Sequence, residues 1–172
     1  IKFKNSILNV DPLLKEIKNI ITESGEIRSD ASSLLLDSFK KKRSLSQNVH
    51  QTLDKLVKDY SLETILQDRY VTTREGRWVL PVISGKQHDF KGLVHDSSNS
   101  KETVFMEPEA VVSFNNKIRE LDDVIKKEVE RLLKQMTDKL HEKINQIMKA
   151  FNTAIDIDTN LSVAEWALLH EA

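Results

Sequence analysis

Hydrophobic positions recur every three or four residues over most of the chain, and this spacing predicts long amphipathic helices. The pattern changes in two segments, Arg69 to Ser84 and Asp89 to Glu107, where β-branched and aromatic residues alternate with polar ones. We therefore predict a mainly α chain with a small β insertion. Its long antiparallel helical lever, a coiled coil, is expected to carry a small antiparallel β-sheet at the distal end.

The first helix has clear start and stop signals. Asp11 followed by Pro12 is typical of a helix start, because aspartate caps the free amide groups and proline suits the first helical position. The helix is expected to run to about Thr22, and Ser24-Gly25-Glu26 is expected to end it.

A second helix is expected to start at Ser29 or Asp30, either of which can act as its N-cap. No proline or glycine interrupts the apolar pattern from Ala31 to Tyr60, so one helix of about 30 residues is predicted there. A short helical turn is expected to follow, from Ser61 to Leu66.

Each β segment has the pattern of a hairpin. The strand-like residues 70–73 and 78–80 are separated by Glu75-Gly76, which suits a tight turn. The strand-like residues 90–95 and 103–106 are separated by residues 96–100, which are all turn formers.

Pro108 precedes the longest helical pattern. Apolar residues form a near-heptad seam over residues 109–151, which predicts a long, stiff helix. A separate final helix is expected from Leu161, because Ser162 and Glu165 have the spacing of a capping box.

These elements divide the chain into four expected parts. Residues 1–66 form the first lever and core helices, and residues 67–108 form the β-rich insertion. Residues 109–151 form the returning lever helix, and residues 152–172 start the return to a core.

The two long helices flank the insertion and must run antiparallel. If Leu66 and Pro108 lie together beside the sheet, Lys40 to Arg43 face Arg131 to Lys134 on the returning helix. The basic run is then expected on the shaft of the lever and away from the sheet.

Composition changes this picture only locally. The 172 residues are 39% hydrophobic and 31% charged, and the net charge is −1, so the chain as a whole does not attract polyanions. Between Lys40 and Tyr60, however, six basic residues outnumber two aspartates, whereas Asn152 to Ala172 holds four acids and no base. Attraction of a charged partner is therefore expected only at particular segments.

Several kinds of chemistry are excluded by the sequence. The absence of cysteine excludes disulfides, thiolate zinc sites and cysteine nucleophiles. No phosphate-binding G-x-x-x-x-G-K-[ST] loop occurs, and His141-Glu142 lacks the second histidine of a zinc-binding helix. No apolar run approaches the roughly 18 to 20 residues of a membrane span. We expect no metal site, no catalytic residues and no cofactor in this chain, which begins at Ile1 without an initiator methionine and is expected to be part of a longer protein.

Two groups of residues have both a functional and a structural interpretation. His95-Asp96 beside two serines resembles a hydrolytic set, but neighbouring strand residues face opposite sides, so we favour a structural His95. Trp78, Phe90 and Phe105 could stack on bases, but their positions on short strands favour packing in the core.

Basic residues on or beside the sheet are the candidates for nucleic-acid contact. They can neutralise phosphates without reading sequence, and they are Arg74, Arg77, Lys86, Lys91 and Lys101. The segment from Arg69 to Pro108 is nearly neutral, with six bases against five acids, so one copy alone should bind weakly. A secondary basic patch is formed by Lys40, Lys41, Lys42 and Arg43, although on a helix these side chains splay around the cylinder and favour a solvated surface.

Three stretches of the insertion have distinctive amino-acid sequences. They are Arg77-Trp78-Val79-Leu80-Pro81-Val82, Lys91-Gly92-Leu93-Val94-His95-Asp96-Ser97-Ser98 and Thr103-Val104-Phe105-Met106-Glu107-Pro108, followed on the long helix by Asn115-Asn116 and Arg119-Glu120-Leu121. With Gly25-Glu26-Ile27 and Asp30-Ala31-Ser32, they resemble the lever and clamp region of MutS proteins. The resemblance is to the second bacterial class, which lacks the mismatch-reading N-terminal domain, and it covers about Ile17 to Leu140.

The chain departs from that family at the tip of the sheet. Ile83 replaces a common lysine after Pro-Val, which removes one candidate phosphate contact. The segments at 84–89 and 98–102 also differ from the sequences that are usual in that family. These changes affect the contacts that the tip can make and leave the expected architecture intact.

The resemblance implies a function for the parent protein. Relatives are homodimeric ATPases in which paired levers and clamps enclose nucleic acid, so ATP and Mg²⁺ are expected in the parent and not in this chain. The implied partners are branched DNA or the rRNA of collided ribosomes. The implied location is the bacterial cytoplasm, and no membrane partner is expected. The parent is expected to suppress recombination or rescue ribosomes. Many members of the family also carry a C-terminal Smr nuclease domain, so the parent is expected to be an endonuclease as well.

One alternative from another class stays open. The chain fits a structural coiled-coil adaptor whose β tip docks a protein partner. Binding to a nucleic-acid backbone should weaken steeply with added salt, whereas protein docking should not.

Overall fold

The computed structural model describes residues 11–170, and contacts group the chain into two units. The first unit is residues 1–31 with 129–172, and the second is residues 32–128. The chain start at Ile1 and the last acid of the C-terminal stretch, Glu171, lie outside the described residues.

In the first unit, helix α1 (Asp11–Ile20) lies against helix α3 (Glu109–Leu169), where Lys139 donates to Glu16 at 2.6 Å. The predicted end of α1 is confirmed. The backbone N–H of Thr22 donates to the carbonyl of Glu26 at 2.8 Å, and Gly25 takes the left-handed conformation that this turn requires, with φ of 85°.

In the second unit, helix α2 (Ser33–Val57) is capped by Ser32, whose hydroxyl accepts from the Leu35 N–H at 3.1 Å. The predicted cap at Ser29 or Asp30 is therefore wrong. The carboxylate of Asp30 is instead bound by the Arg28 guanidinium, with two contacts of 2.9 Å.

The end of α2 also differs from the expected helix through Tyr60. The Asp59 carboxylate accepts from the Ser61 N–H at 2.9 Å, which starts the 3-10 turn Tyr60–Leu62. From there the chain leaves the helix axis, and Leu66 forms an isolated bridge with Val82 of the sheet. The short turn predicted from Ser61 is confirmed as this 3-10 segment.

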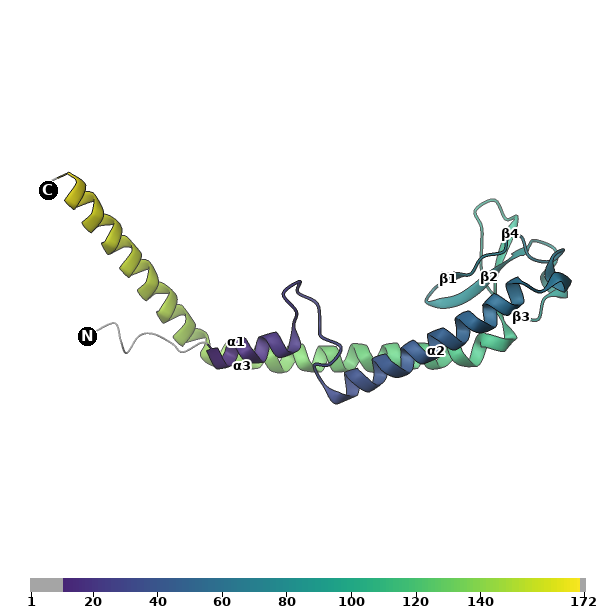
Figure 1. Ribbon diagram of the computed structural model, residues 1–172, viewed down its shortest axis with the longest axis horizontal. Coiled ribbons are helices and arrows are strands. Elements are labelled where there is room, and N and C mark those ends of the chain that lie inside the picture. Colours follow the sequence, from purple (N-terminus) through teal and green to yellow (C-terminus); the bar gives the residue numbers. More distant parts are fainter. Residues whose placement is uncertain (1–10, 171–172) are drawn as a thin grey trace. The chain divides into compact units, whose positions relative to one another are not determined.

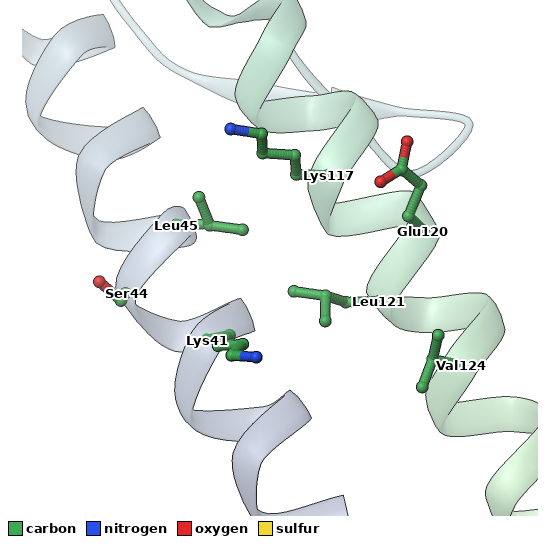
Figure 2. Close-up of a pocket in the computed structure, with 7 residues that line it drawn as sticks. All are labelled: Lys41, Ser44, Leu45, Lys117, Glu120, Leu121 and Val124. Carbon is green, nitrogen blue, oxygen red and sulfur yellow. The ribbon is translucent and has the colours of Figure 1, made fainter. Parts of the chain in front are cut away.

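Helices α2 and the first part of α3 run antiparallel, side by side (Figure 1). Lys42 forms an ion pair with Asp122, and Leu45 faces Leu121 across an open groove of about 500 Å³ (Figure 2). The expected pairing of Lys40 to Arg43 with Arg131 to Lys134 is therefore wrong. The pairing is offset because α2 ends at Val57, and the stretch from there to Leu66, which holds only the 3-10 turn Tyr60–Leu62, does not extend the lever.

Helix α3 continues without a break from Glu109 to Leu169. The separate helix expected from Leu161 is wrong, because no proline or glycine interrupts the run and a capping box alone does not end the preceding turn. Polar side chains in this region bond within the helix: Asn160 donates from Nδ2 to the carbonyl of Asp156 at 2.6 Å.

Four antiparallel strands form the sheet, in the order β1-β2-β4-β3. The strands are β1 (Thr72–Arg74), β2 (Arg77–Ile83), β3 (Gly92–Ser97) and β4 (Thr103–Pro108), with a 3-10 turn, Gln87–Asp89, before β3. Both predicted hairpins are confirmed. Glu75 and Gly76 both have positive φ, 51° and 76°, as a type I′ turn requires.

One apolar core joins the sheet to the helices of the second unit, at the end where α2 stops and α3 begins. Strands β2 and β4 and helices α2 and α3 all contribute to it, through Val49, Leu53, Leu80, Val82, Val104, Met106, Val111 and Ile118. The mainly α chain with a small antiparallel sheet is thus confirmed. Among residues 11–170, no helix has both the length and the apolar character needed to cross a bilayer.

Candidate nucleic-acid interface

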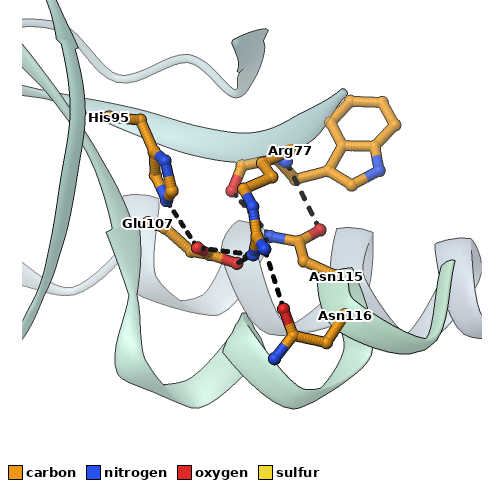
Figure 3. A network of polar contacts seen from close by, with 6 residues as sticks. Arg77, His95, Glu107, Asn115 and Asn116 are labelled. Atoms are coloured by element: carbon orange, nitrogen blue, oxygen red, sulfur yellow. Dashed lines mark hydrogen bonds and ion pairs between the residues drawn. The ribbon is translucent and has the colours of Figure 1, made fainter. Parts of the chain in front are cut away.

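A buried carboxylate organises the base of the sheet. Glu107, near the end of β4, has no exposed surface, and Nη1 of Arg77 donates to both of its oxygens at 2.9 and 3.0 Å (Figure 3). Its other contacts are with Nε2 of His95, at 2.6 Å, and with Nδ2 of Asn115, which donates at 2.7 Å. A buried charge is tolerated only with such partners, so these contacts fix the geometry of the site.

The same network ties the sheet to helix α3. The side-chain amide of Asn115 bonds both backbone groups of Trp78, accepting from its N–H at 3.3 Å and donating to its carbonyl at 3.2 Å. Nη2 of Arg77 donates to Oδ1 of Asn116 at 2.8 Å (Figure 3). Strand β2 is thus bonded directly to the second turn of α3.

Sequence reasoning did not single out Glu107, Asn115 or Asn116 as site residues. An acid directly after the apolar run Val104 to Met106 was the available signal, because a carboxylate on a buried strand needs a partner. His95 belongs to this network through Glu107, and Asp96 forms an ion pair with Arg74 instead. The structural role favoured for His95 is therefore supported by a specific contact, with Glu107.

The two candidate arginines are already engaged within the chain. Arg77 makes the contacts described above and is largely buried. The guanidinium of Arg74 lies 3.7 Å from the ring centre of Phe105, and its Nε is 3.2 Å from the Asp96 carboxylate. Both arginines therefore help to hold the sheet together, which limits their freedom to contact phosphates.

The three candidate lysines are exposed. Lys86 is 3.9 Å from the carboxylate of Asp89, which is at the limit of an ion pair. Lys91 precedes β3 and Lys101 lies in the β3–β4 turn with φ of 59°; neither has an ionic partner among residues 11–170. The structure thus divides the five predicted contacts into two structural arginines and three available lysines.

The aromatic residues of the sheet pack inward, as expected. Phe90 and Phe105 are buried, and the half-buried Trp78 ring meets His50 of α2 edge-on, with centroids 4.2 Å apart. The core interpretation is confirmed for all three predicted residues. Tyr60, which was expected at the end of the apolar pattern of α2, is exposed instead.

The secondary basic patch lies on α2, on the shaft as expected. Its members do splay: Lys42 bonds Asp122, Lys41 borders the groove of Figure 2, and Lys40 and Arg43 are exposed. A dispersed set of cations does not form a single concave site.

The ATP and Mg²⁺ expected in the parent do not fit the residues of this chain. ATP needs a phosphate-binding loop that the sequence lacks, and residues 11–170 offer no cluster of three His, Cys, Asp or Glu side chains for a metal ion. No step of chemistry is therefore assigned to ATP or Mg²⁺ within these residues.

Known proteins are similar to this chain over most of its length. The chain is 35% identical over 162 residues to the protein named Endonuclease MutS2 of Lachnospira eligens, a match that covers 94% of the chain. The chain is a relative of the MutS2 proteins. Endonuclease MutS2 of Thermotoga neapolitana is 31% identical over 163 residues, or 95% of the chain, and that of Agathobacter rectalis is 38% identical over 131 residues, or 76%.

The chain spans about a fifth of these MutS2 proteins, 21%, 21% and 16% of their lengths in the same order. No family model matches the chain. The match confirms the predicted resemblance to the second MutS class, and the similarity is to one segment of these proteins.

Proposed function

We propose that this segment is the lever and clamp of a MutS2-type protein, and that its sheet contacts the backbone of nucleic acid. The observation that carries the proposal is the set of three exposed lysines, Lys86, Lys91 and Lys101, around a sheet whose two arginines are engaged within the chain. Lysine is a point charge that attracts phosphate without requiring a fixed geometry. Branched DNA and the rRNA of collided ribosomes present the same phosphate groups, and both remain candidate substrates.

In the proposed mechanism, the sheet and the first turns of helix α3 move as one body. The bonds from Asn115 and Asn116 to β2, together with the shared apolar core, couple a load on the sheet to α3. A continuous helix is a suitable element to carry that load to ATPase domains elsewhere in the parent.

The activity of the whole protein belongs to this proposal as well. The parent would act as a homodimer in the bacterial cytoplasm, bind ATP and Mg²⁺ in its ATPase domains, and suppress recombination or rescue ribosomes. The relatives are named endonucleases, and the proposal places any nuclease activity of the parent outside the lever and clamp.

A salt titration tests the proposal. The 172-residue chain is titrated with a labelled four-way DNA junction and, in parallel, with a base-paired rRNA hairpin, from low to physiological salt. If three lysines each neutralise one phosphate, the slope of log K against log salt should be about −2.7, from roughly −0.9 per phosphate for duplex DNA.

Binding with a slope near zero, or no binding to either probe at low salt, would contradict the proposal. A steep slope with only one probe would identify the substrate. Retention of a protein partner at all salt concentrations, without nucleic-acid binding, is the result expected for the adaptor alternative.

A further inference from the structure

The two edges of the sheet differ in how well they are protected against pairing with another strand. Strand β1 is three residues long and includes Arg74, and short, charged edges resist pairing with other strands. Strand β3 is six residues long and exposes Leu93 and Val94, with 54% and 56% of their surfaces accessible. Two adjacent strand residues face opposite sides, so β3 presents apolar side chains on both faces of its edge.

The hydrogen-bond pattern shows which backbone groups of β3 are free. The carbonyl of Lys91 accepts from the Glu109 N–H at 3.1 Å, so by antiparallel alternation the backbone groups of Leu93 also face β4. Gly92 pairs with Pro108, which has no N–H to donate. This pair is therefore one of the positions without hydrogen bonds between the two strands. The N–H and C=O groups of Gly92 and Val94 therefore face away from the sheet.

We propose that β3 is an interface for a second copy of this chain, which pairs with it edge to edge about a two-fold axis at Leu93. In this register Gly92 of each copy bonds Val94 of the other, and the two Leu93 side chains meet directly. In the same register Lys91 of one copy lies opposite His95 of the other and beside Asp96. Asp96 is already ion-paired with Arg74 of its own chain, so Lys91, which has no ionic partner among residues 11–170, would add a second cation to that carboxylate.

A β-bulge limits this pairing to two copies. The register of β3 against β4 shifts between Val94 and Asp96, and this leaves His95 as the extra residue. The alternation of outward backbone groups is interrupted there, and beyond it the Ser97 N–H donates to the Asp96 carboxylate at 2.8 Å, so the continuous free edge ends after Val94. A two-fold pairing uses the whole free edge and leaves none for a third copy.

So short an interface should be weak when the copies are free. It buries less than the roughly 1,200 Å² of a standard stable interface. Two copies held together elsewhere in a parent protein would meet at an effective concentration in the millimolar range, on the order expected for tethered partners. The pairing itself does not require nucleic acid, so it can fail or succeed independently of the proposed function.

Disulfide trapping tests the pairing, because the chain contains no cysteine. In the proposed register Leu93 faces its copy at a position without hydrogen bonds, where Cα atoms are about 4.5 Å apart, within the range that a disulfide spans. Under mild oxidation and without nucleic acid, the Leu93→Cys chain should form covalent dimers at least about tenfold faster than Thr73→Cys on the β1 edge, since only the former places two thiols together. Equal rates would show random collision and overturn the proposal.

Two further variants separate pairing from misfolding. Val94→Lys places a cation at the edge, and Val94→Pro removes an N–H that faces away from β4, so both should leave the sheet folded. Combined with Leu93→Cys, each should reduce dimer formation to the Thr73→Cys rate while the circular dichroism spectrum is unchanged. Dimer formation that persists in a folded variant would overturn the proposal.

Discussion

Arg77 and Glu107 form an ion pair at the base of the sheet, where one arginine nitrogen donates to both carboxylate oxygens at 2.9 and 3.0 Å. Arg77 begins β2 and Glu107 lies near the end of β4, so the pair joins two neighbouring strands beside the start of α3. Because Glu107 has no exposed surface, its charge depends on these contacts for solvation.

Removal of Arg77 should therefore destabilise the second unit strongly. We expect Arg77→Ala to lower the free energy of unfolding by about 3 to 5 kcal/mol, the usual cost of leaving a buried charge unpaired. Urea unfolding followed by circular dichroism measures this change. The matched control is Lys101→Ala, which removes an exposed charge of the same sheet and should change stability by less than about 0.5 kcal/mol.

The double variant Arg77→Met, Glu107→Leu removes both charges. It should recover part of the stability lost in Arg77→Ala, because no unpaired charge stays buried, while His95 and Asn115 still lose the acceptor that Glu107 provides. An Arg77→Ala protein as stable as the Lys101→Ala control would contradict the structural role given to this pair.

Gly92 should not tolerate a side chain. A Cβ at this position would lie 2.3 Å from the backbone oxygen of Glu107, and a backbone atom cannot move away as a flexible side chain can. We expect Gly92→Ala to destabilise the protein by about 1 to 3 kcal/mol, as overpacking usually does. Thermal unfolding compares it with Ser100→Ala in the exposed β3–β4 turn, and equal melting temperatures would argue against this close approach.

The cap of α2 gives a test of the observed helix start. Ser32→Ala should cost about 1 kcal/mol of stability, because the Leu35 N–H loses its acceptor. Ser29→Ala, at the position that the sequence suggested for the cap, should have little effect. The reverse ranking in urea unfolding would mean that the helix begins where the sequence pattern placed it.

Asp59 should make stability depend on pH. Hydrogen bonds from Ser61, from its side chain and then its backbone N–H, hold the pKa of the Asp59 carboxyl below its ordinary value. A lowered pKa in the folded state stabilises the fold above the ordinary aspartate range, and this contribution is lost as the pH falls through the lowered value. The stability difference between the original chain and Asp59→Ala should therefore be largest near neutral pH and shrink in acid. A difference that stays constant with pH would exclude this linkage.

Local chemistry explains which parts of the fold could be predicted. The hairpin at Glu75-Gly76 was predictable because the turn depends on those two residues alone, and both have the required positive φ. The end of α2 was not, because Leu66 bridges to Val82, a contact that no local pattern reveals. The pairing of the two long helices depends on that end, so it could not be placed correctly either.

The candidate site divides in the same way. Exposed lysines in turns could be predicted as available cations from their positions. The engagement of Arg77 could not, because its partners Glu107 and Asn116 lie 30 and 39 residues further along the chain. A charged residue at the start of a strand is compatible with either role until its distant neighbours are known.

Two charge-matched triple variants test the central claim most directly. One replaces Lys86, Lys91 and Lys101 with alanine on the sheet, and the other replaces Lys40, Lys41 and Arg43 on α2, leaving Lys42 with Asp122. Each removes three positive charges, so their net charges are equal. Affinity for the labelled DNA junction and the rRNA hairpin is measured at low salt for both variants and the original chain.

If the sheet contacts the nucleic-acid backbone, the sheet variant should lose most of the affinity and nearly all of its salt dependence, while the α2 variant keeps both. Equal losses in the two variants would mean that net charge alone drives binding. Loss confined to the α2 variant would place the contact on the shaft and contradict the account.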